Sequence, residues 1–442
     1  MLSLPLMVRC MLLVVAAMCG EDDSESVWDE LGGPAQAKWP DPLAQLTWRD
    51  SVRPALAEAR RDGRPLFVTF RCLPCKQCAD FDQNVLEGGP ELTPLLRQFI
   101  TVRLTDASDL DMNIFPAQGF QDFDLSWWGY LLSPQGQVYG VFGGRDHISD
   151  KTRISVRALV NTLARVLNHH YDSRRTRWNL DGKQADLAAA PQLPDTLPGY
   201  ASWLKRRPQF EEQNCLHCHQ VAEVLRQPQL DRDTFDIVKD LGIWPLPENV
   251  GLVLNRDHGL RVEKVQDDGP AARAGIRPGD HLLGAGGRRL FGQADFRGVL
   301  HRQADPGGTI DIHWLRDGQR KSATLHLRPG WRKTNLNWRT SVAQGNIGAG
   351  PGFAWAHRGP REGITPGKMS MRPWFGPHPE RSIAYRAGLR RRHIITAVEG
   401  HSTDLYGRAF MIWFRLQHKA GDQVTLTILD GANQRQLTYT LE

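Results

Sequence analysis

Five of the seven cysteines lie in two tight clusters, and their spacing is the first feature of the chain that could do chemistry. The first cluster reads Cys72-Leu73-Pro74-Cys75 and stands between an apolar run at residues 66–70 and a helical pattern. A thiolate at such a strand-to-helix junction is stabilised by the free N–H groups and the dipole of the helix, which lowers its pKa. With two residues between them, Cys72 can attack a disulfide and Cys75 can resolve the mixed disulfide. The pattern therefore predicts thiol–disulfide exchange.

A third cysteine of this cluster, Cys78, lies three residues beyond Cys75, about one helical turn along the same face. Three interpretations stay open. Cys78 is a small buried side chain, or an alternative partner for Cys75 that would move the reactive pair by one turn, or part of a three-cysteine metal site with no evident fourth ligand. We treat Cys72, Cys75 and Cys78 as the catalytic cluster and expect Cys72 to be the attacking thiolate.

The second cluster is Cys215-Leu216-His217-Cys218-His219. This is the attachment signature of haem c, in which two thiols form thioethers and the histidine that follows them is an axial ligand of the iron. Cys215, Cys218 and His219 are therefore the candidate haem-binding residues, with His219 as the metal ligand. A plain disulfide, a zinc site and a chance match remain alternatives.

The elements around the first cluster predict a fold. We expect a helix at 53–61, a strand at 66–70, helices at 76–86 and 92–99, a strand at 99–104, a hairpin at 127–142 and a helix at 150–167. This order, together with the Cys-x-x-Cys motif, resembles a thioredoxin-like α/β sandwich, which would cover residues 42–172. Thioredoxins carry a cis-proline that faces the site, and residues 125–128 contain no proline.

The rest of the chain reads as a linker at 173–200, a short segment with the Cys-x-x-Cys-His motif at 201–240, and two copies of one unit. Residues 269–280 are echoed at 383–394, where a small-residue helix again ends at a glycine before an apolar strand. Both copies resemble PDZ domains. We therefore expect a multidomain protein with two mainly-β PDZ-like domains, at 241–330 and 335–442.

The first copy offers a peptide site at Gly251-Leu252-Val253-Leu254, the likeness of a PDZ carboxylate-binding loop and first strand. PDZ domains bind C-terminal peptides by strand addition, with backbone N–H groups on the carboxylate. Gly251 permits close backbone approach. Leu252 and Leu254 share one face of the strand and can wall an apolar pocket, so we expect Leu252→Glu to abolish binding without unfolding the domain.

The two PDZ-like copies have an alternative role to peptide binding. A neighbouring stretch of chain could fill either groove, which would make the domains spacers. The second copy is the poorer candidate for peptide binding, because Arg392-His393 stands where the first has Gly279-Asp280, and a Pro/Gly-rich insert occupies residues 350–379.

The N-terminal residues predict export. Residues 1–20 contain one charged side chain and an apolar run, and acidic residues follow, as in a secretory signal peptide. We expect the protein in the periplasm or cell envelope. Cys19 is a candidate for a lipid-modified membrane tether, although Met18 fits that role poorly. The net charge of +6 is spread along the chain, which argues against a nucleic-acid partner.

The full order of motifs resembles the thioredoxin-like/PDZ domain-containing (seleno)protein family, some members of which are thought to carry selenocysteine in the redox motif. The resemblance implies redox chemistry at the first cluster. No Gly-x-Ser-x-Gly sequence occurs, so the PDZ likeness does not imply a protease. Our main hypothesis is an exported thiol–disulfide oxidoreductase that binds haem c, a redox partner protein and, through its PDZ domains, protein C-termini. The alternatives are a non-catalytic electron-transfer or haem-sensing scaffold and a PDZ adaptor.

Overall fold

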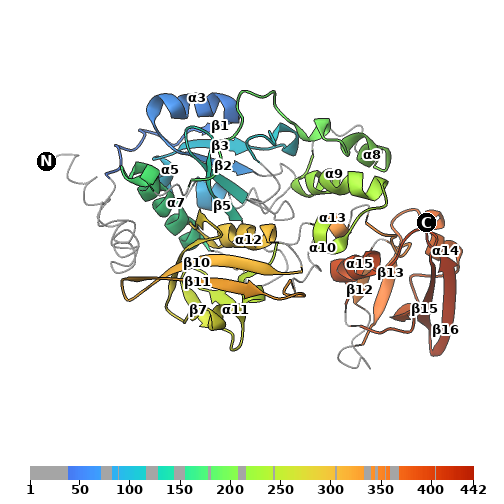
Figure 1. Cartoon of the computed structure of the whole chain (residues 1–442). Coiled ribbons are helices and arrows are strands. Elements are labelled where there is room, and N and C mark those ends of the chain that lie inside the picture. The colour runs from blue at the N-terminus through green and yellow to red at the C-terminus, as the bar shows by residue number, and fades with distance from the viewer. Residues whose placement is uncertain are drawn as a thin grey trace. The chain divides into compact units, whose positions relative to one another are not determined.

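A computed structural model describes residues 38–70, 82–87, 89–115, 128–143, 155–177, 181–207, 216–241, 244–303, 306–332, 340–343, 347–353, 355–358, 368–403 and 405–442 (Figure 1). The chain forms two compact units. The first comprises Met1–Leu197, Gln213–Val221 and Gly242–Thr334, and the second comprises Pro198–Glu212, Ala222–Leu241 and Asn335–Glu442. The expected signal peptide and Cys19, Cys72, Cys75, Cys78 and Cys215 lie outside the described residues.

The N-terminal part of the first unit is a five-stranded sheet in the order β1-β3-β2-β4-β5. Its strands are β1 (Trp48–Arg49), β2 (Leu66–Phe70), β3 (Ile100–Leu104), β4 (Trp128–Leu132) and β5 (Val138–Gly143). The first three run parallel, and β4 and β5 are antiparallel to their neighbours. All five residues of β2 are buried, which explains why its sequence is apolar except for Thr69 and does not alternate between apolar and polar residues.

Helices cover both faces of this sheet (Figure 1). On one face lies α3 (Val52–Asp62), and on the other lie α5 (Thr93–Leu96) and α7 (Val156–Tyr171). The apolar stripe of α7 packs with Phe67 and Leu131 from the sheet. Ser155 caps α7 by accepting a hydrogen bond from the Ala158 N–H, so the helix begins later than the sequence predicts. A one-turn π-helix, η1 (Asp82–Leu86), precedes α5.

The expected linker does not run free of the first unit. The 3₁₀ turns η3 (Arg175–Arg177) and η4 (Pro194–Thr196) bracket a segment held by hydrogen bonds to its backbone. Arg53 donates to the Leu187 and Ala189 carbonyls at 3.3 and 3.2 Å, and Asn113 donates to the Ala190 carbonyl at 2.7 Å. These contacts lay the segment along the outside of the sheet domain.

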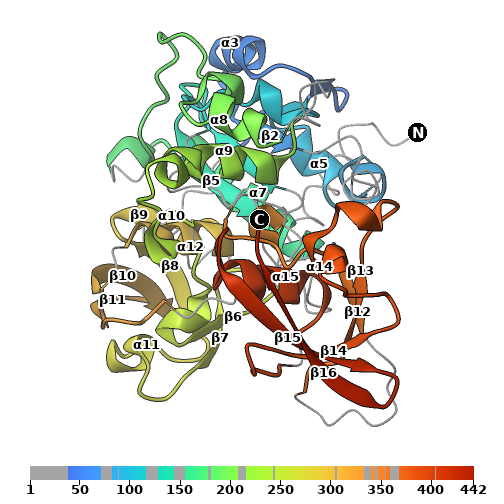
Figure 2. The same ribbon diagram turned by 90° about the vertical axis from the view of Figure 1, so that its right-hand side faces the viewer.

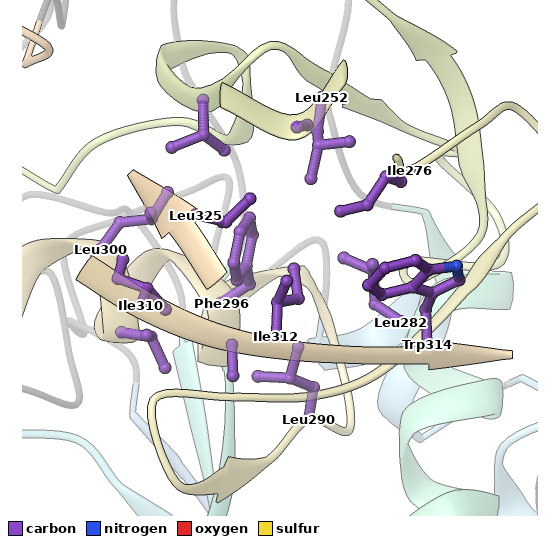
Figure 3. Close-up of a cluster of buried hydrophobic side chains, with 14 of the residues drawn as sticks. Leu252, Ile276, Leu282, Leu290, Phe296, Leu300, Ile310, Ile312, Trp314 and Leu325 are labelled. Atoms are coloured by element: carbon purple, nitrogen blue, oxygen red, sulfur yellow. The ribbon is translucent and has the colours of Figure 1, made fainter. Parts of the chain in front are cut away.

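The C-terminal part of the first unit is mainly β-structure. A sheet in the order β11-β10-β8-β9 combines β8 (His281–Ala285), β9 (Arg288–Arg289), β10 (Gly308–Arg316) and β11 (Gln319–Leu327). A separate antiparallel pair joins β6 (Leu252–Leu254) to β7 (Val262–Val265), and the 3₁₀ turn η6 (Pro247–Val250) leads into it. The helices are α11 (Pro270–Arg273) and α12 (Gln293–Arg302). Their apolar side chains form one core, part of which Figure 3 shows.

The two parts of the first unit join where β9 and α12 cover β5, the edge strand of the first sheet. The buried Asp295 carboxylate accepts N–H bonds from Val141 at 2.8 Å and, within its own domain, from Phe291 at 2.8 Å and Gly292 at 3.0 Å. Arg288 donates to two carbonyls of β5 at 3.0 Å each. An edge strand carries unpaired backbone groups. Asp295 and Arg288 supply hydrogen bonds to some of these groups on β5.

A buried histidine, His169, and a half-buried one, His258, line the same junction. Arg289 donates to Nδ1 of His169 at 3.3 Å, so this nitrogen is the acceptor and Nε2 carries the proton that is donated to Asp181. Burial lowers the pKa of His169 to about 4, against the effect of Asp181 and with that of the Arg289 and Arg175 guanidinium groups. Burial likewise lowers the pKa of His258, on the second part, to about 3. The junction therefore requires neutral imidazoles.

The second unit begins with helices. It contains α8 (Tyr200–Lys205), the later part of α9 (Cys218–Asp231), α10 (Ile237–Asp240) and α13 (Thr340–Ala343). Trp203 and Arg207 both donate to one oxygen of the buried Glu223, at 2.9 and 3.1 Å. The expected segment at 201–240 is thus divided between the two units. Within the described residues, no helix has the length and apolar character needed to cross a bilayer.

The rest of the second unit is an antiparallel sheet in the order β12-β13-β14-β15-β16 (Figure 2). Its strands are β12 (Trp355–Arg358), β13 (Met371–Trp374), β14 (Ile394–Val398), β15 (Gln423–Asp430) and β16 (Asn433–Thr440), with η7 (Pro379–Arg381), α14 (Ile383–Arg386) and α15 (Gly407–Arg415) between them. The succession α14, β14, α15 and a closing hairpin repeats that of α11, β8, α12 and β10–β11. The internal repeat in the sequence thus corresponds to a repeated order of helices and strands.

We expect Asp295→Ala to destabilise the first unit by about 3–5 kcal/mol, because it leaves three buried N–H groups without their acceptor. Equilibrium urea unfolding of the full chain measures the change. Asp267→Ala is the matched control, since Asp267 is an exposed carboxylate of the same part of the unit and its loss should cost under about 0.5 kcal/mol. Equal stability of the two variants would contradict the packing described.

We also expect stability to fall as the pH is lowered from 6.5 towards 4. Unfolded His169, with a pKa near 6.5, takes up a proton that the folded protein excludes, which costs up to about 1.4 kcal/mol per pH unit. Urea midpoints at pH 7, 6 and 5 measure the slope. His169→Gln should reduce the slope, because glutamine can bond Asp181 and Arg289 without titrating. An unchanged slope in this variant would exclude His169 as a contributor.

Candidate redox and peptide-binding sites

The first cysteine cluster follows the carboxyl end of β2, although its residues lie outside the described ones. Phe70 ends β2 and pairs in register with Leu104, the last residue of the parallel strand β3. The ring of Trp128 stacks on Phe70 with centroids 5.2 Å apart and planes 13° apart. Cys72 is the second residue after Phe70 in the sequence. The strand that precedes the Cys-x-x-Cys motif therefore ends in a buried aromatic contact.

The Cys-x-x-Cys-His segment packs against the loop that follows β3. The Leu216 N–H donates to a carboxylate oxygen of Asp106 at 3.1 Å, and the Leu216 carbonyl accepts from the Ala107 N–H at 3.1 Å. Asp106 also caps the 3₁₀ turn η2 (Ala107–Asp109) by accepting from Ser108 at 2.8 Å. Because β2 and β3 are parallel and end in register, this docking lies at the sheet edge where β2 ends, two residues before Cys72 in the sequence. The sequence alone did not predict this docking.

Cys218 and His219 begin α9, so a thiol and an imidazole stand at neighbouring positions of its first turn. His217 and His219 stack with ring centroids 5.6 Å apart and planes 8° apart. This donor set, with Cys215 in the sequence, is chemically suited to haem c. Cys218 is only 6% exposed, so covalent attachment at this thiol requires the start of α9 to be less packed than it is here.

The predicted peptide-binding strand is the edge strand β6. The Gly251 carbonyl accepts from Gln266, and the Asn255 N–H donates to the Arg261 carbonyl, both at 2.8 Å and both towards the β7 side. Antiparallel pairing alternates, so the backbone groups of Leu252 and Leu254 face the other side. Within the described residues, no strand pairs with that side of β6. The strand thus has the open edge that peptide addition requires.

Comparison with known families assigns both parts of the first unit. Residues 47–123 match the model described as thioredoxin-like, and residues 241–327 match the PDZ domain.

The chain has a thioredoxin-like domain and a PDZ domain.

Individual relatives match the PDZ region. The serine protease Do-like HtrA of Bacillus subtilis is 26% identical over 121 residues, which are 26% of each chain. A probable periplasmic serine endoprotease DegP-like of Pseudomonas savastanoi is 34% identical over 80 residues, 18% of this chain and 16% of that protein. A solved serine endoprotease from Yersinia pestis is 32% identical, with a TM-score of 0.15 over 16% of this chain and 26% of that one. The chain spans about a quarter or less of these relatives.

In the loop before β6 of the PDZ domain, some backbone N–H groups already donate hydrogen bonds within the loop. The Asn249 N–H donates to the Leu246 carbonyl at 2.9 Å, and the Gly251 N–H donates to the Glu248 carbonyl at 3.0 Å. Gly251 has a φ of +82°, a conformation that favours glycine. A carboxylate bound at this loop would therefore have to use the Leu252 N–H or replace a bond of η6.

The chain before this loop lies along α12. Trp244 stacks on His301 with ring centroids 4.4 Å apart and planes 8° apart, and Arg297 donates to the Trp244 carbonyl at 3.1 Å. Neighbouring chain thus covers part of the α12 surface of the PDZ domain, as the spacer alternative supposes, while the edge of β6 stays open.

The expected effect of Leu252→Glu needs correction. Leu252 is 0% exposed and, as Figure 3 shows, its side chain is directed into the PDZ core with Ile276 and Phe296. Leu254 is 7% exposed and belongs to the same core, whereas Val253 is half-buried on the other face. The predicted alternation is confirmed, but the face that Leu252 and Leu254 share is the core of the domain. A charge at Leu252 would therefore disrupt folding rather than binding alone.

We expect Leu252→Glu to unfold the PDZ domain or to destabilise it by several kcal/mol, about 4 or more, because it buries a carboxylate without a partner. Val253→Glu, one residue along the same strand, should cost about 1 kcal/mol. Thermal unfolding followed by circular dichroism of the full chain compares the two. A Leu252→Glu protein as stable as Val253→Glu would contradict the burial of Leu252.

Proposed function

We propose that the protein is an exported thiol–disulfide oxidoreductase whose PDZ domain recruits a protein partner. The observation that carries this proposal is that β2 of the thioredoxin-like sheet ends at Phe70, two residues before Cys72. In the sequence the motif thus follows the strand directly, where a helix after it would stabilise a thiolate.

The proposed reaction is a balanced two-electron exchange. The Cys72 thiolate attacks a substrate disulfide, forms a mixed disulfide and releases one substrate thiolate. The Cys75 thiolate then attacks the Cys72 sulfur and releases the second substrate thiolate. The substrate has become a dithiol, and Cys72 and Cys75 have become a disulfide. A separate redox protein with a dithiol would restore the reduced form.

The second candidate function is electron transfer or haem sensing, and the docking of the Cys-x-x-Cys-His segment at Asp106 favours it. Cys215 and Cys218 would hold haem c, and His219 would ligate its iron. The haem would supply one-electron chemistry beside the loop that follows β3. Periplasmic location and a tether at Cys19 belong to the same proposal, and one matched relative is itself described as periplasmic.

We expect purified protein to reduce insulin disulfides with dithiothreitol as reductant, and Cys72→Ser to lower the rate at least about 100-fold, because a serine hydroxyl stays protonated at neutral pH. Cys78→Ser is the matched control and should keep the rate within about two-fold. Loss of activity in Cys78→Ser with retention in Cys72→Ser would show that Cys78, and not Cys72, is the nucleophile. An inactive wild-type protein would leave the second candidate.

That second candidate is decided by a denaturing gel stained for haem peroxidase activity, on protein made in a host with haem-attachment machinery. A band in the wild type that weakens in Cys218→Ala supports thioether attachment. An unstained wild-type band removes haem from the proposal.

A further inference from the structure

The loop between β6 and β7, residues 255–261, is fastened to the thioredoxin-like domain by side chains of α7. Asn161 donates to the Asp257 carbonyl at 3.0 Å, and Arg165 donates to the His258 carbonyl at 3.0 Å. The same guanidinium group donates to the Phe291 carbonyl at 3.1 Å, which holds it in place from a second side. The loop that follows the open strand β6 is therefore attached to a helix of the other domain.

The imidazole of His258 lies at the centre of this attachment and acts there as a hydrogen-bond acceptor. Its Nδ1 accepts from the Arg261 N–H at 3.1 Å and, more weakly, from the Leu260 N–H at 3.4 Å. Nη2 of Arg165 lies 3.1 Å from both ring nitrogens. A neutral imidazole has one acceptor nitrogen, whereas a protonated imidazole has only donors. The closed arrangement of the loop therefore requires a neutral ring.

Cations face His258 from two sides. Burial has the largest effect on the pKa of its ring, and the Arg165 guanidinium on α7 and the Arg261 guanidinium in its own loop lower that pKa further, to about 3. The carboxylate of Asp257, the preceding residue in the loop, is exposed. A proton on His258 would thus be repelled both by the helix that the loop contacts and by the loop itself.

A second imidazole packs against the first. The ring centroids of His258 and of His281 on β8 are 4.6 Å apart, and the ring planes are 89° apart. Nε2 of His281 is buried and has no hydrogen-bond partner among the described residues. Burial lowers the pKa of His281 well below its usual range, and Arg165, Arg289 and Arg261 add to this effect. Neither ring of the pair can take up a proton easily while the loop stays closed.

We propose that His258 is an acid-sensitive latch, which holds the loop against α7 when its ring is neutral and releases the loop when its ring is protonated. In the released loop the ring is in water and has an ordinary pKa of about 6.5. The latch is therefore closed above this pH. Below it, proton uptake by the released form favours release by at most about 10-fold per pH unit.

The release is local, because other contacts keep the two domains together. Asp295 and Arg288 bond β5 at a different part of the junction, and neither bond involves the loop. The loop joins β6 to β7, its neighbour in a two-stranded sheet, so acid would loosen the strand to which a partner adds. That consequence rests on the proposed function. The latch does not, and its test needs no partner.

The test is hydrogen exchange of the full chain, followed by mass spectrometry of the peptide that contains residues 255–261. Protection factors correct for the effect of pH on the chemical exchange rate. Between pH 7.5 and pH 5.5 the protection of the loop should fall about 10-fold in the wild type. Strand β10 of the PDZ core should stay better protected than the loop at both pH values, because the opening is local.

Three variants separate the latch from a simple fastening. His258→Gln should remove most of the fall, because glutamine can accept from the Arg261 N–H without titrating. Asn161→Ala should lower the protection of the loop about 5-fold at both pH values and leave the fall between them unchanged, since it removes a bond to the loop but no titrating group. His326→Gln, at an exposed histidine on β11, is the matched control and should behave as the wild type does.

Three results would overturn the latch: loop protection in the wild type that is the same at both pH values, an equal fall in His258→Gln and the wild type, or exchange of β10 as fast as that of the loop at pH 5.5. If His258→Gln loosens the loop already at pH 7.5, the comparison stays valid, because the ratio between the two pH values is what is measured. None of these results depends on peptide binding, so the latch and the proposed function can fail separately.

Discussion

The packing of the two parts of the first unit depends on the hydrogen bonds that the buried Asp295 carboxylate accepts. Together with Arg288, this carboxylate satisfies backbone groups of β5, the edge strand of the thioredoxin-like sheet. A sheet edge otherwise needs water or another strand. The Asp295 contact is buried and the Arg288 contacts are half-buried, so the PDZ domain cannot turn against the sheet without leaving polar groups unpaired. The open edge of β6 therefore keeps a constant position relative to the carboxyl end of β2.

Two edges of the thioredoxin-like sheet contact different parts of the chain. Its β5 edge is closed by the PDZ domain, and the loop after β3 receives the Cys-x-x-Cys-His segment through Asp106. The chain leaves the same carboxyl edge towards Cys72. Under the proposed function, electron exchange would take place at the carboxyl edge of the sheet, and the partner would bind at the β6 edge of the PDZ domain. This separation suits a protein that must hold a partner and exchange electrons with it at the same time.

The sequence was sufficient for features that depend on local pattern. The continuously buried strand β2 and the alternation around Leu252 were both predictable, as was the repeated element order. Contacts between distant segments were not. Asp295 is three residues after Gly292 and has the pattern of an ordinary helix cap. His258 lies in a polar turn between two strands, and that composition carries no information about the arginine of α7 that lies against its ring.

Phe291 shows that the boundary between the two domains in sequence is not their boundary in packing. It belongs to the chain segment matched as PDZ, yet its ring is 1% exposed and lies in the core of the thioredoxin-like domain, beside Tyr139 and His169. A gene rearrangement that moved residues 241–327 into another protein would carry along an uncovered aromatic ring and a carboxylate without its strand. The pair is therefore expected to be inherited together, as one evolutionary module rather than two.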